Sequence, residues 1–249
     1  MKDWHLFSRK TKNLEEKWNI KTMFGANLNF AATEAYKVLR TNLKFSFPDD
    51  GRGKVIGITS AVQSEGKSTT ACNIAYVLAE EQEKVILLEA DLRRPTIASK
   101  LGIARRPGLI NMLVNRESGD EVVQTSPYAP NVAVISSGDV PPNPSELLGS
   151  DRMAEVLDDL RKKYRYIIVD LPPVTVVSDT LAMSKSLDGV VVVVREDVSD
   201  RKQLGEAMRQ LKMAGVSVLG FVYRAAEDSN KHYGGSKYKR YGYYAETKR

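Results

Sequence analysis

The sequence predicts an α/β domain in which a mostly parallel sheet is covered by helices on both faces. Short apolar segments alternate along the chain with segments whose apolar residues recur at the helical period. The apolar segments, such as YIIVD and GVVVVVR, are hydrophobic at consecutive positions, which is typical of strands buried on both sides. At 249 residues the chain is long enough to bury an ordinary hydrophobic core.

The predicted elements follow one another in a regular order. A helix comes first, and helical segments then separate successive strands, as parallel pairing requires. The segment before the third strand has a less regular helical pattern. The predicted strands are 54–60, 84–90, 131–136, 166–170, 189–195 and 217–223. The predicted helices are 31–44, 67–81, 152–164 and 200–214.

This order divides the chain into three parts. We expect an N-terminal arm at 1–30, a single domain at 31–224, and a flexible tail rich in tyrosine and lysine at 225–249. The arm has aromatic residues among charges, which fits either docking on a partner or membrane surface, or a disordered leader. The sequence has neither the apolar length of a membrane helix nor the apolar stretch of a signal peptide.

The net charge of +6 is concentrated in the tail. Residues 231–249 hold six basic residues and one acidic residue, a net +5, so the rest of the chain is nearly neutral. A nucleic-acid-binding domain would spread positive charge over a folded face, so we expect no nucleic acid as partner. The single cysteine, Cys72, precludes an internal disulfide and is interpreted as a buried structural thiol in a reducing cytosol.

The stretch ITSAVQSEGKSTT connects the first strand to the next helix. From Ala61 to Ser68 it reads A-x-x-x-x-G-K-S, the pattern of a phosphate-binding loop with alanine in place of the first glycine. Such a loop combines inward-pointing amides, a helix N-terminus, a lysine and a hydroxyl. We therefore expect Lys67 to meet the β- and γ-phosphates of ATP and Ser68 to hold Mg²⁺. The predicted nucleotide-binding residues of the loop are Ser64, Glu65, Gly66, Lys67, Ser68 and Thr69.

One position of the loop departs from the usual pattern. Ser64 stands where related loops usually carry glycine. A serine adopts positive φ less freely than glycine, so we expect the turn to be restricted there.

Carboxylates follow two of the predicted strands. Asp170 ends YIIVD at the edge where open parallel sheets bind ligands, and it suits a Mg²⁺-bound water. Glu89 and Asp91 in ILLEADLRRP are two positions apart, so in an extended chain both carboxylates point to the same side. Taken by themselves, these carboxylates also fit a strand cap or a solvated turn. Their place beside the phosphate-binding loop favours a catalytic role. The predicted catalytic residues are Lys67, Glu89, Asp91 and Asp170, with Ser68, Asp91 and Asp170 as metal ligands and Glu89 or Asp91 as base.

With ILLEADLRRP and the tyrosine-rich tail together, the sequence resembles the bacterial tyrosine kinases (BY-kinases) of the capsule and exopolysaccharide type. These are P-loop proteins related to the MinD/ParA ATPases. The resemblance covers about residues 30–249: 61–69 match the family's Walker A motif, 89–93 its A′ motif and 167–173 its Walker B motif. Its oligomer motif E-x-x-R-x-x-R is matched by Glu34, Lys37 and Arg40, with lysine replacing the first arginine.

Two further positions depart from the family pattern. Glu89 stands where the first aspartate of a D-x-D pair is usual, which moves the carboxylate by one methylene. Arg224 stands where relatives often carry an asparagine that contacts adenine, so it is predicted to contact the nucleotide. Arg93 and Arg94 either hold phosphates, contact a neighbouring subunit or lie in a solvent-facing turn.

The resemblance implies an ATP-dependent protein-tyrosine kinase that uses Mg²⁺. It implies a cytoplasmic protein recruited to the inner face of the cell membrane through an adaptor of the polysaccharide co-polymerase type, whose cytoplasmic end helps complete the nucleotide site. It also implies cycling between a ring-shaped homo-oligomer and phosphorylated monomers, linked to polysaccharide polymerisation and export.

The resemblance makes the tail the acceptor, phosphorylated by neighbouring subunits. Fully extended, it would span at most ~80 Å, at about 3.3 Å per residue. Each phosphate adds about −1.5 to −2 charges, so three or more reverse its net charge, and we expect this reversal to loosen the assembly. The alternative is a tail that adheres to lipid or polysaccharide. The predicted phosphorylation sites are Tyr233, Tyr238, Tyr241, Tyr243 and Tyr244.

Two other functions compete with the kinase. One is a MinD/ParA-like ATPase switch, although such loops usually carry an extra early lysine that SAVQSEGKS lacks. The other is a weakly active nucleotide-sensing scaffold, which the substitutions at Ser64, Glu89 and Arg224 favour.

Overall fold

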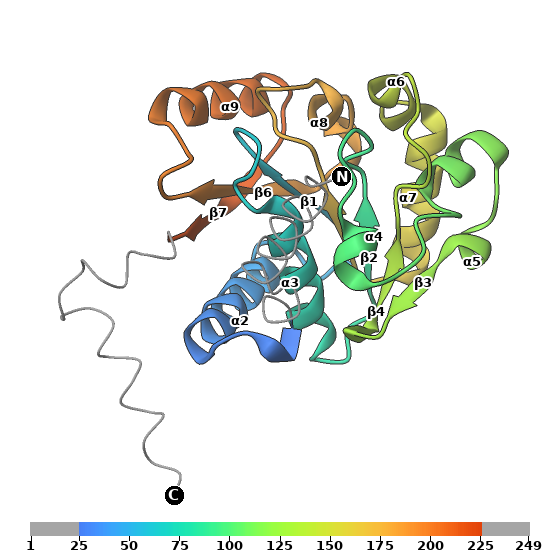
Figure 1. Ribbon diagram of the computed structural model, residues 1–249, viewed down its shortest axis with the longest axis horizontal. Helices are drawn as coiled ribbons and strands as arrows, with labels where there is room; N and C mark the ends of the chain where they lie inside the picture. The colour runs from blue at the N-terminus through green and yellow to red at the C-terminus, as the bar shows by residue number, and fades with distance from the viewer. Residues whose placement is uncertain (1–24, 226–249) are drawn as a thin grey trace, which may run out of the picture.

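A computed structural model describes residues 25–225 of the chain (Figure 1). These residues fold around a seven-stranded sheet with the strand order β3-β4-β2-β5-β1-β6-β7. Neighbouring strands are parallel except β3 and β4, which are antiparallel. The strands are β1 Lys54–Ser60, β2 Val85–Glu89, β3 Gln124–Ser126, β4 Ala129–Ile135, β5 Tyr166–Asp170, β6 Gly189–Arg195 and β7 Val218–Arg224.

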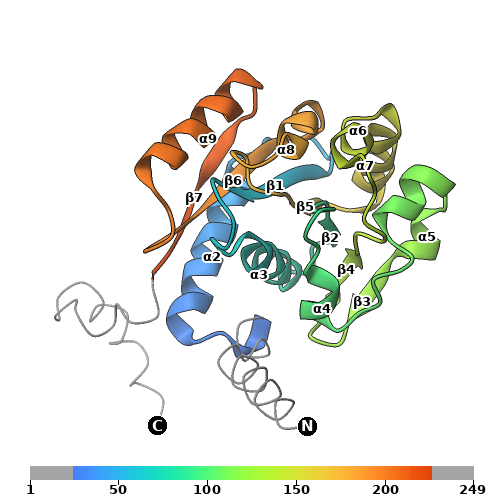
Figure 2. The same ribbon diagram turned by 45° about the horizontal axis from the view of Figure 1, so that its top comes forward.

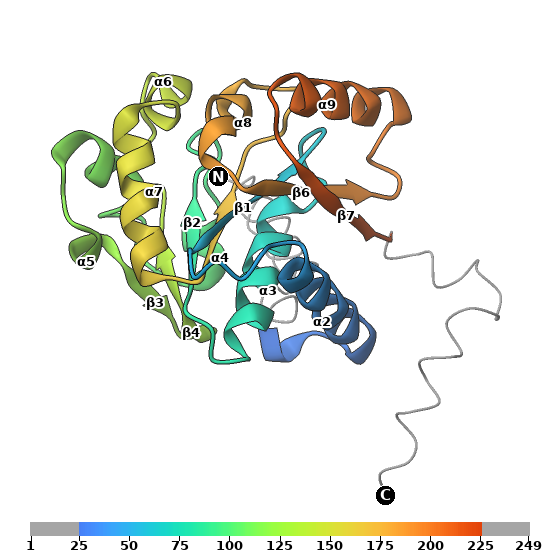
Figure 3. The same cartoon turned by 180° about the vertical axis from the view of Figure 1, so that it is seen from behind.

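Helices cover both faces of the sheet, as Figures 1 and 3 show, which confirms the predicted fold class. Helices α2 and α3 lie side by side on one face (Figure 2), and α7 and α9 cover the other. The long helices are α2 Phe30–Phe45, α3 Lys67–Ala79, α7 Asp151–Lys163 and α9 Arg201–Met213. The shorter segments are η2 Gly25–Asn27, α4 Ile97–Leu101, the π-helical η3 Asn111–Asn115, α5 Gly119–Val122, α6 Pro144–Leu148, α8 Asp179–Ala182 and η4 Ser184–Ser186.

The core lies on the two sides of the central strands. Every residue of β1, β2 and β5 is buried, as their continuous apolar runs predict. Helix α3 is buried along most of its length, whereas α7 buries only the stripe Met153, Val156, Leu157 and Leu160. Burying each such side chain stabilises the fold by about 1.5–3 kcal/mol. Cys72 lies in the α3 core and is buried, which confirms its interpretation as a structural thiol; burial also raises its pKa.

Side-chain caps fix where the long surface helices begin. The Ser150 side chain accepts a hydrogen bond from the Met153 N–H at the start of α7, and Asp200 accepts one from the Gln203 N–H at the start of α9. Each cap satisfies one of the N–H groups that a helix leaves without a partner, a contribution of about 1 kcal/mol.

The predicted strands and long helices agree with the structure to within two residues at each end. The expectation of six strands is wrong, because a seventh, β3, pairs with β4 in the antiparallel sense. At three residues it is too short to show a period of two in the sequence. The short helices α6 and α8 were also not predicted, because a single turn carries no helical period.

The parallel arrangement brings the ends of β1, β2 and β5 to one edge of the sheet. Asp170, the last residue of β5, is in register with Ile58 of β1 and with Glu89 of β2. The loops that follow these strands therefore lie close together at the edge of the sheet where the strands end. No helix within residues 25–225 is both long and apolar enough to cross a membrane. The N-terminal arm before residue 25 and the tail tyrosines lie outside the described residues.

Candidate active site

The phosphate-binding loop leads from β1 directly into α3. Gly66 is the N-cap of α3, has a φ of 93°, and provides no side chain to cap the helix. The first turn of α3 contains no acidic residue. The N–H groups of this turn and the positive end of the helix dipole are thus available to an anion, as the sequence pattern predicts.

Ser64 adopts the left-handed conformation that the sequence analysis expected to be difficult for it. Its φ is 65°, one of only a few positive values at non-glycine residues between 25 and 225. A side chain in this region costs about 1 kcal/mol relative to glycine. The loop therefore keeps its turn despite the serine.

Lys67 is held between two of the predicted carboxylates. Its Nζ lies 2.6 Å from Asp91 Oδ2 and 4.0 Å from Asp170 Oδ1. All three side chains are largely buried. Burial disfavours the charged ammonium, but the carboxylates of Asp170 and Asp91 outweigh it and raise the pKa of Lys67. The structure thus brings together the residues expected to bind phosphate and metal.

Asp170 is the least satisfied polar group of the site. Its side chain is fully buried, and neither carboxylate oxygen has a hydrogen-bond partner among the described residues. Burial raises the pKa of Asp170 to about 6, although the nearby Lys67 lowers it. A buried carboxylate without a donor is costly unless a ligand completes it. This geometry fits a Mg²⁺-bound water, the ligand that the sequence analysis assigns to Asp170.

Glu89 is used differently from what the sequence predicts. One carboxylate oxygen, Oε1, accepts hydrogen bonds from the Thr96 N–H at 2.5 Å and the Ile97 N–H at 2.6 Å, at the start of α4. The other, Oε2, accepts one from the Ser137 N–H at 3.0 Å, after β4. Because Glu89 is fully buried and both oxygens are engaged, it joins two loops instead of facing a substrate. Asp91 remains as the candidate base: the Arg94 N–H binds one of its oxygens, but the partner of the other is the side chain of Lys67, which is expected to turn to the phosphates of a nucleotide.

Glu65 lies within the loop, but its side chain turns away from the helix N-terminus. It is fully buried, and Oε2 accepts a hydrogen bond from the Val62 N–H at 2.8 Å. Oε1 accepts a short hydrogen bond from the Ser199 hydroxyl, which in turn accepts one from the Arg195 N–H at 2.7 Å. The loop is therefore fastened to the turn after β6. Ser199 could not be predicted from the sequence, because no motif marks it.

The two arginines of the ILLEADLRRP motif have separate contacts. Arg93 makes a two-pronged ion pair with the buried carboxylate of Asp179 at 2.9 and 3.0 Å, and so ties the end of β2 to α8. Arg94 donates from Nη1 to Gln63 Oε1 at 2.7 Å, and its backbone N–H donates to Asp91 Oδ1 at 3.1 Å. Both arginines are exposed, but Arg93 is held beside α8 and Arg94 lies beside the phosphate-binding loop.

The last predicted nucleotide contact, Arg224, reaches the loop from the end of β7. A Cβ built on Gly66 would lie 1.6 Å from Arg224 Nη1 and 2.7 Å from its Cζ. A side chain at position 66 would displace the Arg224 guanidinium from this place. The remaining loop residues Ser68 and Thr69 lie in the first turn of α3, where the sequence pattern places them.

The three residues of the predicted oligomer motif lie on α2. Glu34 and Lys37 form an ion pair with each other at 2.9 Å and are partly exposed. Arg40 instead points to α3, where Nη1 donates to the Val77 carbonyl at 2.8 Å and Nη2 pairs with Glu81 at 2.8 Å. Within the described residues, Arg40 therefore serves as an intramolecular contact.

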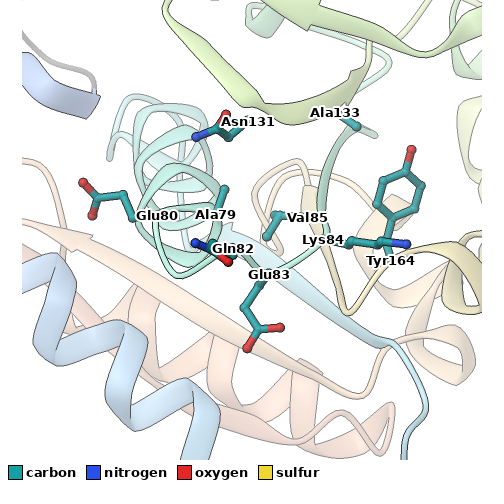
Figure 4. Close-up of a pocket in the computed structure, with 9 residues that line it drawn as sticks. All are labelled: Ala79, Glu80, Gln82, Glu83, Lys84, Val85, Asn131, Ala133 and Tyr164. Carbon is teal, nitrogen blue, oxygen red and sulfur yellow. The ribbon is translucent and has the colours of Figure 1, made fainter.

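A depression of about 540 Å³ lies at the other edge of the sheet (Figure 4). It opens at the start of β2, by Lys84 and Val85, and is bordered by Glu83 and Tyr164. The strands are parallel, so their starts lie on the side away from Asp91 and Asp170. The depression is not part of the candidate site.

The comparisons with known proteins agree with this geometry. A profile of the AAA domain matches residues 53–213, so the chain belongs to this class of P-loop protein. It is 35% identical over 212 residues to the tyrosine-protein kinase YwqD of Bacillus subtilis, covering 85% of this chain and 86% of YwqD. The chain belongs to the bacterial tyrosine-protein kinase family.

Solved structures give the same result. The kinase domain of Escherichia coli tyrosine kinase Etk superimposes with a TM-score of 0.75 at 31% identity, covering 83% of this chain and 80% of that domain. MinD of Pyrococcus horikoshii, complexed with Mg-ADP, superimposes with a TM-score of 0.58 at 23% identity over 69% of this chain and 70% of MinD, which shows the shared fold. Some other curated relatives, among them EpsB of Ralstonia solanacearum and Etk of Escherichia coli, are longer, and the chain spans 28 to 30% of their length.

Proposed function

We propose that the chain is an ATP-dependent protein-tyrosine kinase that phosphorylates the tyrosine cluster of its own tail between subunits. The observation that carries this proposal is the grouping of Lys67, Asp91 and Asp170 at the phosphate-binding loop, where the Asp170 carboxylate has no hydrogen-bond partner among the described residues. Membership of the tyrosine-kinase family supports the acceptor chemistry.

The residues of the site fit a nucleotide and its metal ion. The amides at the start of α3 would hold the phosphates, with Lys67 over the β- and γ-phosphates. Ser68, Asp91 and Asp170 would hold Mg²⁺ directly or through water. When bound, Mg²⁺ would neutralise charge on the phosphates. The MinD likeness, from a complex with Mg-ADP, supports this ligand set.

The proton of the acceptor requires a base, because a free tyrosine has a pKa near 10. We assign this role to Asp91, since both oxygens of Glu89 are engaged by backbone N–H groups, whereas one oxygen of Asp91 is bound only by Lys67, which would turn to the phosphates. The phenolic proton passes to the Asp91 carboxylate as the phenolic oxygen forms its bond to the γ-phosphorus. The bond from that phosphorus to the ADP oxygen breaks, and ADP leaves.

The biological setting follows from the family resemblance. We propose that a membrane adaptor of the polysaccharide co-polymerase type recruits the chain to the cytoplasmic face of the membrane. The unphosphorylated form would assemble as a homo-oligomer, and tail phosphorylation would loosen it and regulate polysaccharide polymerisation and export. Glu34 and Lys37, which are partly exposed on α2 and form an ion pair with each other, would take part in a contact between subunits.

A phosphotyrosine assay tests the kinase activity. Purified protein is incubated with Mg-ATP, with and without a peptide from the cytoplasmic end of a candidate adaptor. We expect phosphotyrosine in the wild type and none in Lys67→Ala. Replacing the five tail tyrosines by phenylalanine removes the signal if the tail is the acceptor.

The same assay identifies the competing functions. Release of free phosphate without phosphotyrosine would indicate an ATPase switch. Tight ATP binding with neither product would indicate a nucleotide-sensing scaffold. Mixing Lys67→Ala protein with an active variant lacking the tail tyrosines tests transfer between subunits, because only such transfer labels the inactive chain.

A further inference from the structure

Two arginines stand side by side at the ends of neighbouring parallel strands. Arg195 ends β6, Arg224 ends β7, and the two residues are in register. Val193 of β6 and Val222 of β7 pack in the core cluster on the α3 side of the sheet. Since side chains alternate along a strand, Arg195 and Arg224 point to this same face. Both guanidinium groups therefore emerge above the N-terminal end of α3.

Both side chains reach the phosphate-binding loop. Arg195 donates from Nη1 to the Ser64 carbonyl at 3.2 Å. Arg224 lies against Gly66, where its Nη1 takes up the space that a Cβ would need. Residues separated by about 130 positions or more in the chain are thus in contact at the point where α3 begins.

Cationic groups and a helix N-terminus gather around this point. Lys67 pairs with Asp91 on one flank of the loop. The other flank carries Arg195 and Arg224, and the 13-residue helix α3 adds its positive end without an acidic residue in its first turn. The fully buried carboxylate of Asp170, which has no hydrogen-bond partner among the described residues, is a separate indication that a ligand with its metal ion completes this site.

The chemistry of a guanidinium, together with its position, indicates which part of a nucleotide Arg224 contacts. Arginine has five donors and no acceptor, so it cannot accept a hydrogen bond from the amino group that identifies adenine. It pairs strongly with phosphate oxygens, often through two parallel bonds. The place of Arg224 over Gly66, where backbone amides point at phosphates, favours the phosphate chain over the base.

We propose that Arg224, aided by Arg195, binds the phosphate chain of the nucleotide and contributes equally to the binding of adenine and guanine nucleotides. The inference rests on the proposed nucleotide-dependent function, and it names the part of the substrate that β6 and β7 recognise. Arg224 then adds affinity for phosphate, and no preference between the two bases.

Equilibrium binding tests the proposal independently of catalysis. Calorimetry with ATP, GTP and inorganic tripolyphosphate, each with Mg²⁺, is performed on the wild type, Arg224→Ala and Arg224→Lys. We expect Arg224→Ala to weaken all three ligands by about tenfold, as the loss of one charge-assisted contact predicts. Arg224→Lys keeps the charge and should stay within about threefold of the wild type.

Two further comparisons make the result specific. The salt dependence of ATP binding should become shallower in Arg224→Ala, because one fewer charge contacts the phosphates. Arg209→Ala is the matched control: Arg209 lies on α9, is exposed and pairs with Glu206, and its loss should leave binding unchanged. If Arg224→Ala does not fold, Arg224→Lys and Arg195→Ala provide the test, with a weaker loss expected for Arg195→Ala.

Three outcomes overturn the proposal. A loss of affinity for only one of ATP and GTP would show that Arg224 distinguishes between the two bases. Unchanged binding of all three ligands would show that Arg224 only packs against Gly66. Equal losses of affinity in Arg224→Ala and Arg224→Lys, with equal falls in melting temperature, would show the same. These outcomes are separate from the kinase proposal, since a wild type that binds ATP without forming phosphotyrosine overturns only the latter.

Discussion

Glu65 and Ser199, which are 134 residues apart in the chain, share a short hydrogen bond beneath the phosphate-binding loop. The carboxylate is fully buried, and its second oxygen binds the Val62 N–H. The bond therefore connects the turn after β6 to the loop that β1 supplies.

The first prediction concerns this bond. Ser199→Ala leaves one oxygen of a buried carboxylate without a donor, so we expect the free energy of unfolding to fall by about 2 kcal/mol. Ser199→Thr retains the hydroxyl and should lose much less. Urea unfolding measures both, with Ser99→Ala as a control at an exposed serine. Wild-type stability in Ser199→Ala would contradict the prediction.

The second prediction concerns the positive φ of Ser64. Ser64→Gly removes the Cβ that is strained in this conformation, and we expect the unfolding free energy to rise by about 1 kcal/mol. Ser99→Gly, inside α4, should instead lower it by a similar amount, because glycine is unfavourable within a helix. Thermal unfolding of the two variants should shift in opposite directions, and shifts of the same sign would refute the argument.

The third prediction concerns Glu89. Glu89→Ala leaves three N–H groups in and around the buried loops without their acceptor, and we expect a loss of at least about 3 kcal/mol in unfolding free energy. Glu89→Gln keeps one oxygen acceptor and should lose less. Denaturant titration checks this order, with the exposed Glu155→Ala as the control.

A catalytic base would behave differently. In that case Glu89→Gln would retain the stability of the wild type and abolish phosphotyrosine formation. We expect instead that Glu89→Gln loses stability and keeps measurable activity, so the two measurements together separate a structural carboxylate from a catalytic one.

The fourth prediction concerns the pH dependence of stability. Burial raises the pKa of Asp170 to about 6, above the ordinary value of 3.8 in the unfolded chain. Between these two values the folded state binds more protons than the unfolded state, so this group makes stability fall as pH rises from about 4 to 6. The loss is complete above the folded-state pKa and amounts to roughly 3 kcal/mol or less.

Asp170→Asn tests this effect. The variant should be more stable than the wild type at pH 7.5 in the absence of Mg²⁺, and the difference should vanish near pH 4. It should also lose the Mg²⁺-dependent part of its ATP affinity. Lower stability than the wild type at both pH values would show that the Asp170 charge stabilises the fold.

Local patterns predicted the residues that act through their place in a strand or loop. The P-loop spacing and the positions of Asp91 and Asp170 at strand ends were sufficient to predict that they meet Lys67, because parallel strands end at one edge. Ser199 and the contacts of Glu89 were not predictable in this way. Their partners lie in loops whose approach depends on how whole elements pack, and no spacing in the sequence records it.

Helix α3 has one more consequence. Its first turn is where we propose that the phosphates bind, and Arg40 of α2 donates a hydrogen bond to the Val77 carbonyl in its last turn. With 13 residues at about 1.5 Å each, α3 is a straight helix with a length of roughly 20 Å. If the loop moves along the helix axis when product leaves, α3 would transmit the movement to α2 at its other end. The position of the surface that carries Glu34 and Lys37 would then depend on whether a nucleotide occupies the phosphate-binding loop.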